Sequence, residues 1–292
     1  MLDAASAASG LSFSGSTGTL ELNTSGTLTV GSAVIGAGTV KLDGPGSQLI
    51  YNGTDEFDIT TGTITGAGKI TGPIFATGAA HITANGGMLE IAGAITDIGG
   101  ALVMTIAGAG DKLLLDAASA AHTVTFSSSG TLELNTAGTL TIGTALAIGS
   151  GTLTLDGPGS QLTDNAGISL STGTISGLGK VTGAITATGA AHITAAGGTL
   201  EIASAITNSG SLALTVGSGA SDKLLLDAGS AATSLNFSGS TGTLELNSSS
   251  TLTLTDALTV GANTIKLDGA SSQLTAERWR SPRRSQTAAL SP

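Results

Sequence analysis

The chain has 292 residues, of which 45 are glycine and none is cysteine, and its formal net charge is −10. Only 2% of the residues are aromatic, which argues against an ordinary enzyme core, because aromatic side chains usually supply much of its buried area. The absence of cysteine excludes a disulfide framework and a cysteine-ligated metal site. The acidic body of the chain and the lack of an apolar run near 18 residues argue against nucleic-acid binding and membrane insertion.

A long internal repeat dominates the chain. Two motifs, LDA(A/G)SA and GTLELN, each occur three times, beginning at Leu2, Leu115 and Leu226 and at Gly18, Gly130 and Gly242. We therefore divide the chain into repeat copies 1–113, 114–225 and 226–275, which form one repeat region over 1–275.

A finer period runs inside each copy. A Gly, Asp or Asn followed by a residue and then an apolar–any–apolar run recurs every 19–25 residues. Such alternation predicts half-buried strands, and the Gly, Asn, Asp and Ser between the runs predict turns. The twelve starting residues are Gly18, Gly38, Gly62, Gly87, Asp111, Gly130, Gly151, Gly173, Gly198, Asp222, Gly242 and Asn263.

We predict an all-β fold: a parallel right-handed β-solenoid (β-helix) of about 12 coils of 19–25 residues. One coil cannot bury its own apolar face, but a stack of coils can. The rival prediction, a string of sandwich domains, does not explain why the strand signature recurs with one polarity and register. The predicted inward row is Leu20, Val40, Ile64, Leu89, Leu113 and Leu132, and the outward row is Glu21, Lys41, Thr65, Glu90, Leu114 and Glu133. Phe13, Phe126 and Phe237 share one repeat position and are predicted core plugs.

The two ends depart from the repeat. Met1 leads directly into a motif that lies in mid-strand in the second copy, with no export signal before it. Residues 276–292 carry all four arginines, and we interpret them as a disordered or non-native tail rather than a patch for nucleic acid or an anionic surface. Because solenoids need caps, we expect this chain to be a slice of a longer protein.

The motifs GTLTV, GTVKLDG, GTLELN and GTLTLDG resemble the strand repeats of large bacterial surface proteins, namely autotransporter passenger regions and filamentous-haemagglutinin-like adhesins. The resemblance covers nearly all of residues 1–275. It implies a secreted or cell-surface rod that serves adhesion, although the export signal and the C-terminal membrane barrel of that family are missing.

The main enzymatic alternative is a polysaccharide-acting β-helix, whose site needs carboxylates from neighbouring coils within about 5–10 Å of one another. Asp55, Glu56 and Asp58 form the acidic cluster of this chain, and the second copy has none at the equivalent place. No arginine or histidine lies near in sequence, so we interpret the three as solvated loop charges.

Other candidate sites are weaker. His81 and His192 are repeat-equivalent, and because Ile82 and Ile193 should point inward, we expect both imidazoles on the surface. A metal site needs two or more converging ligands, and no other histidine falls near these two in the pattern; His122 replaces Ser or Thr of the other copies.

Two further motifs have binding counterparts in other solenoids. The segments 108–116 and 217–227, each containing DKLLLD, faintly resemble Ca²⁺-binding β-roll repeats but occur once per copy, so their ligand count is too low. A flat threonine row can bind ice, but the predicted outward row mixes charged and apolar residues. Small polar residues that close the leading strands predict a structural ladder: Asn23, Asp43, Asp116, Asn135, Asp156, Asp227, Asn247 and Asp268.

The sequence thus predicts a structural or adhesive rod with no catalytic, cofactor-binding or metal-binding residue and no cofactor. Expected partners are host or matrix surface glycans or proteins and the adjoining repeats of a longer chain, with no nucleic acid and no membrane insertion. The expected location is extracellular or on the bacterial cell surface. A non-functional gene fragment is the third alternative.

Overall fold

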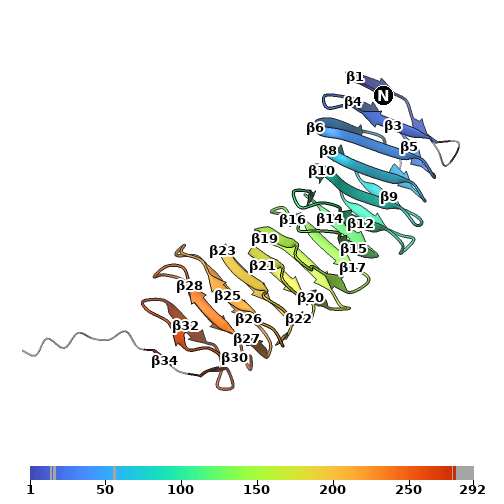
Figure 1. The fold of residues 1–292 in the computed structure, drawn as a ribbon. Helices are drawn as coiled ribbons and strands as arrows, with labels where there is room; N and C mark the ends of the chain where they lie inside the picture. Colours follow the sequence, from blue (N-terminus) through green and yellow to red (C-terminus); the bar gives the residue numbers. More distant parts are fainter. Residues whose placement is uncertain (14, 16–17, 55–56, 278, 281–292) are drawn as a thin grey trace, which may run out of the picture.

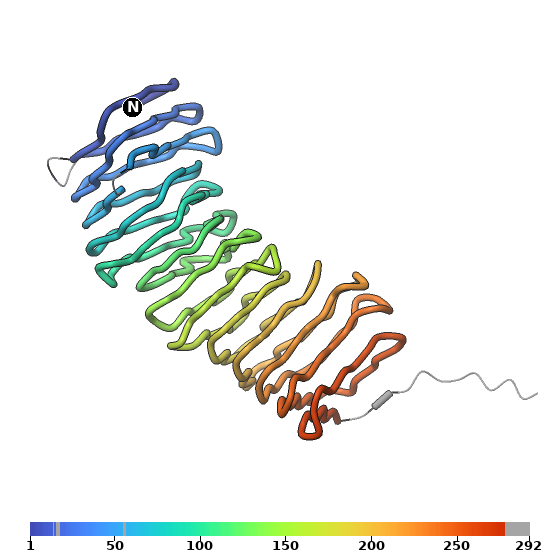
Figure 2. Tube along the Cα trace, turned by 180° about the vertical axis from the view of Figure 1, so that it is seen from behind, coloured from blue at the N-terminus to red at the C-terminus, as the bar shows by residue number. Residues whose placement is uncertain are grey.

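A computed structural model describes residues 1–13, 15, 18–54, 57–277 and 279–280 of the chain. These residues contain no helix and form a right-handed parallel β-solenoid of about 13 turns, which confirms the predicted fold class. The turns stack into a rod that bends near its middle (Figures 1 and 2). The described residues include no helix that could cross a lipid bilayer.

The rod has three strand faces, which we name A, B and C in the order in which the chain visits them. Strands confined to face A are β1 (Ala5–Ala8), β4 (Thr27–Val30), β13 (Lys112–Leu115), β16 (Thr131–Leu134), β25 (Ala213–Val216), β28 (Ser234–Phe237), β31 (Leu258–Thr259) and β34 (Trp279–Arg280). Strands confined to face B are β2 (Leu11–Ser12), β5 (Ala33–Ile35), β7 (Phe57–Ile59), β9 (Ile74–Ala76), β11 (Ile95–Asp97), β14 (Ala118–Ala121), β17 (Thr139–Ile142), β26 (Lys223–Leu226), β29 (Thr243–Leu246) and β32 (Thr264–Leu267). Strands confined to face C are β3 (Thr19–Leu22), β12 (Val103–Ile106), β15 (Thr123–Phe126), β18 (Leu146–Ala147), β20 (Ile168–Leu170), β22 (Ile185–Ala187), β24 (Ile206–Asn208), β27 (Ser230–Ala232), β30 (Thr251–Leu254) and β33 (Gln273–Ala276).

Six longer strands continue around a corner and therefore belong to two faces. In copy 1 they run from face C to face A, and in copy 2 their equivalents run from face A to face B. They are β6 (Thr39–Tyr51), β8 (Thr63–Thr71), β10 (His81–Ile91), β19 (Thr152–Asp164), β21 (Thr174–Thr182) and β23 (His192–Ile202).

Glycine makes these bends possible. Gly66 in β8 has a φ of 118°, and its repeat equivalent Gly177 in β21 has a φ of 108°. A side chain at Gly66 would overlap the backbone carbonyl of Leu42, and one at Gly177 would overlap that of Leu155. The strands can thus turn a corner with no loop between the two faces, because only glycine adopts a positive φ freely.

The copies are related by a rotation of one third of a turn. Copy 1 uses β1–β13, of which three strands span two faces, so it contributes sixteen strand segments, or five turns and one extra segment. Copy 2 (β14–β26) has the same number. Equivalent strands therefore advance by one face per copy: β1 lies on face A, β14 on face B and β27 on face C.

This rotation corrects the predicted rows. Leu20, Val40 and Ile64 do stack on face C, but the next residue of that row is Ile82 rather than Leu89. Leu89 stacks on face A with Leu113 and Leu132. The predicted row is therefore two physical rows on different faces, which is also why there are about 13 turns instead of 12.

The inward residues of all three faces form one continuous apolar core, mainly of Leu, Ile, Val and Ala. Ile64 and Ile82, which stack directly, are both fully buried. The predicted plugs Phe13, Phe126 and Phe237 are only half-buried and pack against the edge of this core. Since each turn supplies the apolar floor of the next, stability depends on neighbouring turns rather than on long-range contacts.

Candidate functional site

Lysine–glutamate pairs bridge adjacent coils on all three faces. Lys41 Nζ lies 2.7 Å from Glu21 Oε1 on face C, and Lys112 Nζ lies 2.7 Å from Glu133 Oε2 on face A. In copy 3 the equivalent glutamate, on face B, contacts two lysines. The same local sequence therefore presents the same ion pair in three directions, as the rotation requires.

The two lysines of copy 3 lower the pKa of the glutamate between them. Glu245 lies between Lys223 at 2.8 Å and Lys266 at 3.0 Å, and its side chain is 11% exposed. The hydrogen bond from Lys223 lowers the pKa of Glu245 to about 2, against the opposing effect of burial. The lysine side chains stay half-exposed, so each pair contributes little to stability.

Copy 2 lacks one lysine of this network. Thr154 occupies the place that Lys41 and Lys266 hold in the other copies. Near it, burial raises the pKa of Asp156, and the neighbouring Glu133 raises it further. The position equivalent to Asp156 in copy 1 instead has its pKa lowered by its lysine.

Restoring that lysine with Thr154→Lys should therefore lower the pKa of Asp156 and stabilise the rod. We expect the free energy of unfolding at pH 7 to rise by up to about 1 kcal/mol. A lowered carboxylate pKa stabilises above the unfolded-state pKa near 4, so the gain should disappear as the pH falls below that value. Urea unfolding at pH 7 and pH 3 measures both effects, and an equal gain in Thr154→Gln would show that charge is not the cause.

The predicted ladder of Asp and Asn side chains is present as isolated rungs. Asn135 Nδ2 donates to Asp116 Oδ1 at 2.8 Å across one coil step, and Asn135 Oδ1 accepts the next backbone N–H. The buried Ser160 hydroxyl donates to the backbone carbonyls of residues 134 and 135. The equivalent rungs are Asn23–Asp3 and Asn247–Asp227. Each rung fixes a corner, so these residues are structural.

In the two segments that resemble calcium-binding repeats, the aspartates form hydrogen bonds to the backbone of a neighbouring coil. Asp111 is buried and accepts the backbone N–H of Gly87 at 2.8 Å, and Asp222 accepts that of Gly197 at the same distance. Among the described residues no group of three or more His, Asp or Glu side chains is placed to hold a metal ion.

The histidines lie on the surface, as expected from their neighbours. His81 and His192 are exposed, whereas Ile82 and Ile193 are fully buried. The rotation places His81 on face C and His192 on face A, so the two repeat-equivalent imidazoles do not share a face.

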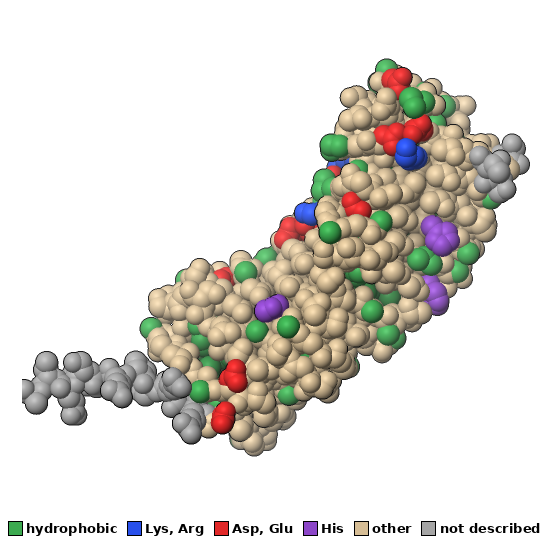
Figure 3. Space-filling model, in the orientation of Figure 1, with side chains coloured by type: hydrophobic (Ala, Val, Ile, Leu, Met, Phe, Trp, Pro, Cys, Tyr) green, Lys and Arg blue, Asp and Glu red, His purple; other side chains and the backbone are tan. Residues whose placement is uncertain are grey.

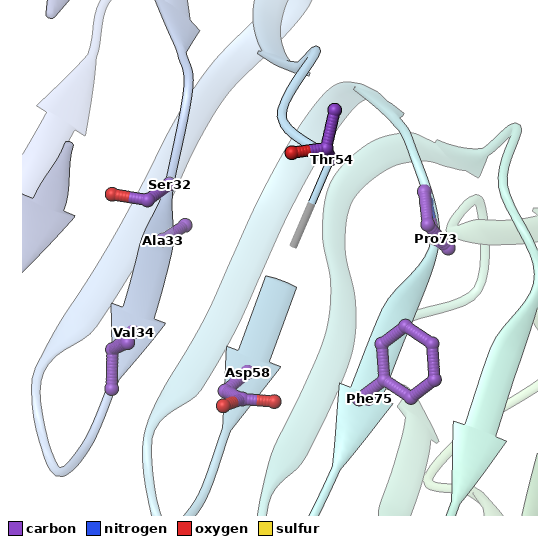
Figure 4. A pocket seen from close by; sticks show the side chains of 7 residues that line it. All are labelled: Ser32, Ala33, Val34, Thr54, Asp58, Pro73 and Phe75. Carbon is purple, nitrogen blue, oxygen red and sulfur yellow. The ribbon is translucent and has the colours of Figure 1, made fainter. Parts of the chain in front are cut away.

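One groove coincides with the predicted acidic cluster. Asp55 and Glu56 lie outside the described residues, but Asp58 lines an open groove of about 770 Å³ on face B (Figure 4). Asp58 stacks between Val34 on one side and Phe75 on the other. Asp58 is the single carboxylate among the described residues that line this groove, whereas glycoside cleavage uses two.

A rank of small, uncharged side chains runs along face C. From β8 onward the eleven strand segments of this face contain no Asp, Glu, Lys or Arg. The predicted outward row holds through Thr65 and then continues as Thr83, not Glu90. Its members are Thr65, Thr83, Thr105, Thr125, Ala147, Ser169, Thr186, Thr207, Ala231, Thr253 and Thr275. We call this row the threonine rank.

The threonine rank is hidden in the sequence because its members stand at non-equivalent repeat positions. At about 4.8 Å per step the rank extends for roughly 48 Å. Figure 3 shows how sparse charge is on one side of the rod, where acidic and basic side chains form a few small clusters. The mixed-charge row that argued against an ordered threonine surface is therefore not a physical row.

Comparison of the chain with protein-family models, with curated proteins and with solved structures finds no match. The fold and these surfaces are thus the basis for assigning a function.

Proposed function

We propose that the chain is a structural and adhesive rod segment of a secreted or cell-surface bacterial repeat protein, and that it performs no catalysis. Its proposed partners are host or matrix glycans or proteins and the adjoining repeats of a longer chain. A stack of turns with a continuous aliphatic core supports this role, because it provides length from simple repeated sequence.

The threonine rank is the observation that supports the adhesive role of the rod. Each threonine offers a hydroxyl that both donates and accepts and a methyl group that contacts apolar atoms. The backbone groups beneath are already paired between strands, so these side chains are what the face presents. A net charge of −10 repels acidic surfaces, whereas the uncharged face can lie flat on a neutral, hydroxyl-rich polymer. Weak contacts repeated along it add through multivalency.

Charge introduced into the rank should abolish such binding. We expect the full chain to be retained on beads of a neutral polysaccharide such as cellulose, and the triple variant Thr83→Arg, Thr105→Arg and Thr125→Arg to be retained at least tenfold less. The reason is that three desolvated guanidinium groups cannot be matched by a neutral surface. Retention and circular dichroism are measured on the same samples.

The matched control places the same change on face A. Thr131, Thr152 and Thr174 stack in consecutive coils and are half-buried, as Thr83 and Thr105 are on face C. Their triple arginine variant should bind as the unmodified chain does. No retention of the unmodified chain, or equal loss in both variants, would contradict the proposal.

The same rank favours ice as a second candidate ligand, because it too is an ordered, uncharged lattice of hydrogen-bonding groups. This candidate predicts that the unmodified chain slows ice growth in the cold, that the face C variant loses the effect and that the face A variant retains it. Observation of ice-crystal shape at the same protein concentrations separates it from polysaccharide adhesion.

A further inference from the structure

The groove at Asp58 has a counterpart in copy 2, and the two differ in the side chains of their outward rows. The copy 2 groove is lined by Ala145, Gly167, Ser169, Ala184 and Thr186, among others. Ser169 and Thr186 of this groove belong to the outward row Ala147–Ser169–Thr186, which is equivalent to the copy 1 row Val34–Asp58–Phe75. Copy 1 thus replaces three small neutral side chains with a carboxylate between two larger apolar groups.

Asp58 is also unusual in its bonding. Its Oδ1 atom is the one buried side-chain polar atom without a hydrogen-bond partner in the described part of the chain. The strand carboxylates elsewhere are matched differently: Glu90 and Glu201 pair with lysines, and Asp164 accepts backbone N–H groups. A buried, unpaired carboxylate oxygen is costly. Asp58 as a whole is only half-buried, so a cation in the groove can pair with its carboxylate and offset part of that cost.

The surroundings of Asp58 favour a cationic donor on an apolar stem. The Val34 side chain is 47% exposed and can contact methylene groups. The Phe75 ring stands beside the carboxylate on the next coil (Figure 4) and offers a face to a cation. No lysine or arginine is among the described residues that line the groove, and the rod as a whole is acidic. Charge complementarity therefore points to a positive partner.

We propose that the Val34–Asp58–Phe75 groove on face B is a binding site for a lysine or arginine side chain of a partner polypeptide. The cationic head would pair with the Asp58 carboxylate, and the aliphatic stem would lie between Val34 and the Phe75 ring. This site is separate from the threonine rank on face C, so it does not depend on the proposed adhesion to glycans.

The test titrates the full chain with N-acetyl-arginine amide and with N-acetyl-lysine amide. The readout is the chemical shift of the Val34 methyl groups in NMR spectra. N-acetyl-norleucine amide, which has a stem but no charge, and glucose are the comparison probes. We expect saturable shifts with one or both cations, weakened at least tenfold by Asp58→Asn and by Phe75→Thr. The proposal would be overturned if neither cation shifted the Val34 signals. It would also be overturned if the signals shifted saturably with norleucine amide or with glucose but not with the cations.

A transplant into copy 2 guards against a variant that fails for structural reasons. The changes Ala147→Val, Ser169→Asp and Thr186→Phe rebuild the row in the equivalent groove and should create a second cation site with similar affinity. Absence of that gain in a folded transplant would contradict the assignment of binding to these three side chains. Because Asp58 and Phe75 lie off face C, their variants should retain any polysaccharide binding, so the two proposals can fail separately.

Discussion

Replacing Gly66 with alanine is expected to lower the free energy of unfolding by about 4 kcal/mol. Two costs add: a φ of 118° is strained for any residue with a Cβ, and the new methyl group would overlap the Leu42 carbonyl oxygen. Because that carbonyl belongs to the ladder between β6 and β8, relief of the overlap would break inter-coil pairing. Urea denaturation followed by circular dichroism measures the loss.

Two other glycines calibrate this prediction. Gly177 has the same geometry in copy 2, so Gly177→Ala should cost about as much as Gly66→Ala. A methyl group at Gly110 would meet no heavy atom within 4 Å, and the φ of Gly110 is not in the left-handed range. Gly110→Ala should therefore change stability by less than about 0.5 kcal/mol. Equal effects at Gly66 and Gly110 would contradict the account of the bend.

Removing one repeat copy should rotate everything that follows it by one face. Deletion of 115–225 joins Leu114 to Leu226 and recreates the sequence DKLLLDAGS of the native junction. We expect the product to stay a β-solenoid, with β27 moved from face C to face B. The threonine rank would then be interrupted by Asn236 directly after Thr105, because β28 moves onto face C while Thr253 moves to face B.

Binding to neutral polysaccharide should therefore fall severalfold relative to a chain of similar length whose rank is intact. Truncation after Thr182 gives that control, since it removes nearly as many residues and keeps the native rank in line as far as Ser169. Equal binding by the two shortened chains would show that alignment of the rank is unimportant.

The strand pattern and the solenoid were predictable because they depend on local alternation and on stacking, which the sequence displays directly. The rotation was not predictable from spacing. Gly62 and Gly87 are 25 residues apart and Gly38 and Gly62 are 24 apart, yet the first interval contains four strand segments and the second contains three. Bends at glycine such as Gly66 consume no loop residues, so length does not reveal the number of corners.

The surface features also divide into those that depend on local alternation, which were predictable, and those that depend on the rotation, which were not. The outward histidines were predicted correctly, since they depend only on the alternation next to Ile82 and Ile193. The threonine rank depends on which residues of neighbouring coils lie on the same face. When the rotation of one third of a turn is left out, its members are assigned to different rows and the rank is not recognised. The groove was signalled by the carboxylate at Asp58, where the copies differ, but its apolar walls come from other coils and could not be placed from sequence.

Engineered cysteine pairs test the one-third-turn rotation most directly, and the absence of native cysteine makes the readout clean. Thr65 and Thr83 are direct neighbours on face C, at a strand spacing compatible with a disulfide. Thr65→Cys with Thr83→Cys should therefore cross-link under mild oxidation, and Thr65→Cys with Glu90→Cys, the pair that the unrotated row would join, should not. Cross-linking of the second pair and not of the first would contradict the rotation and the threonine rank that depends on it.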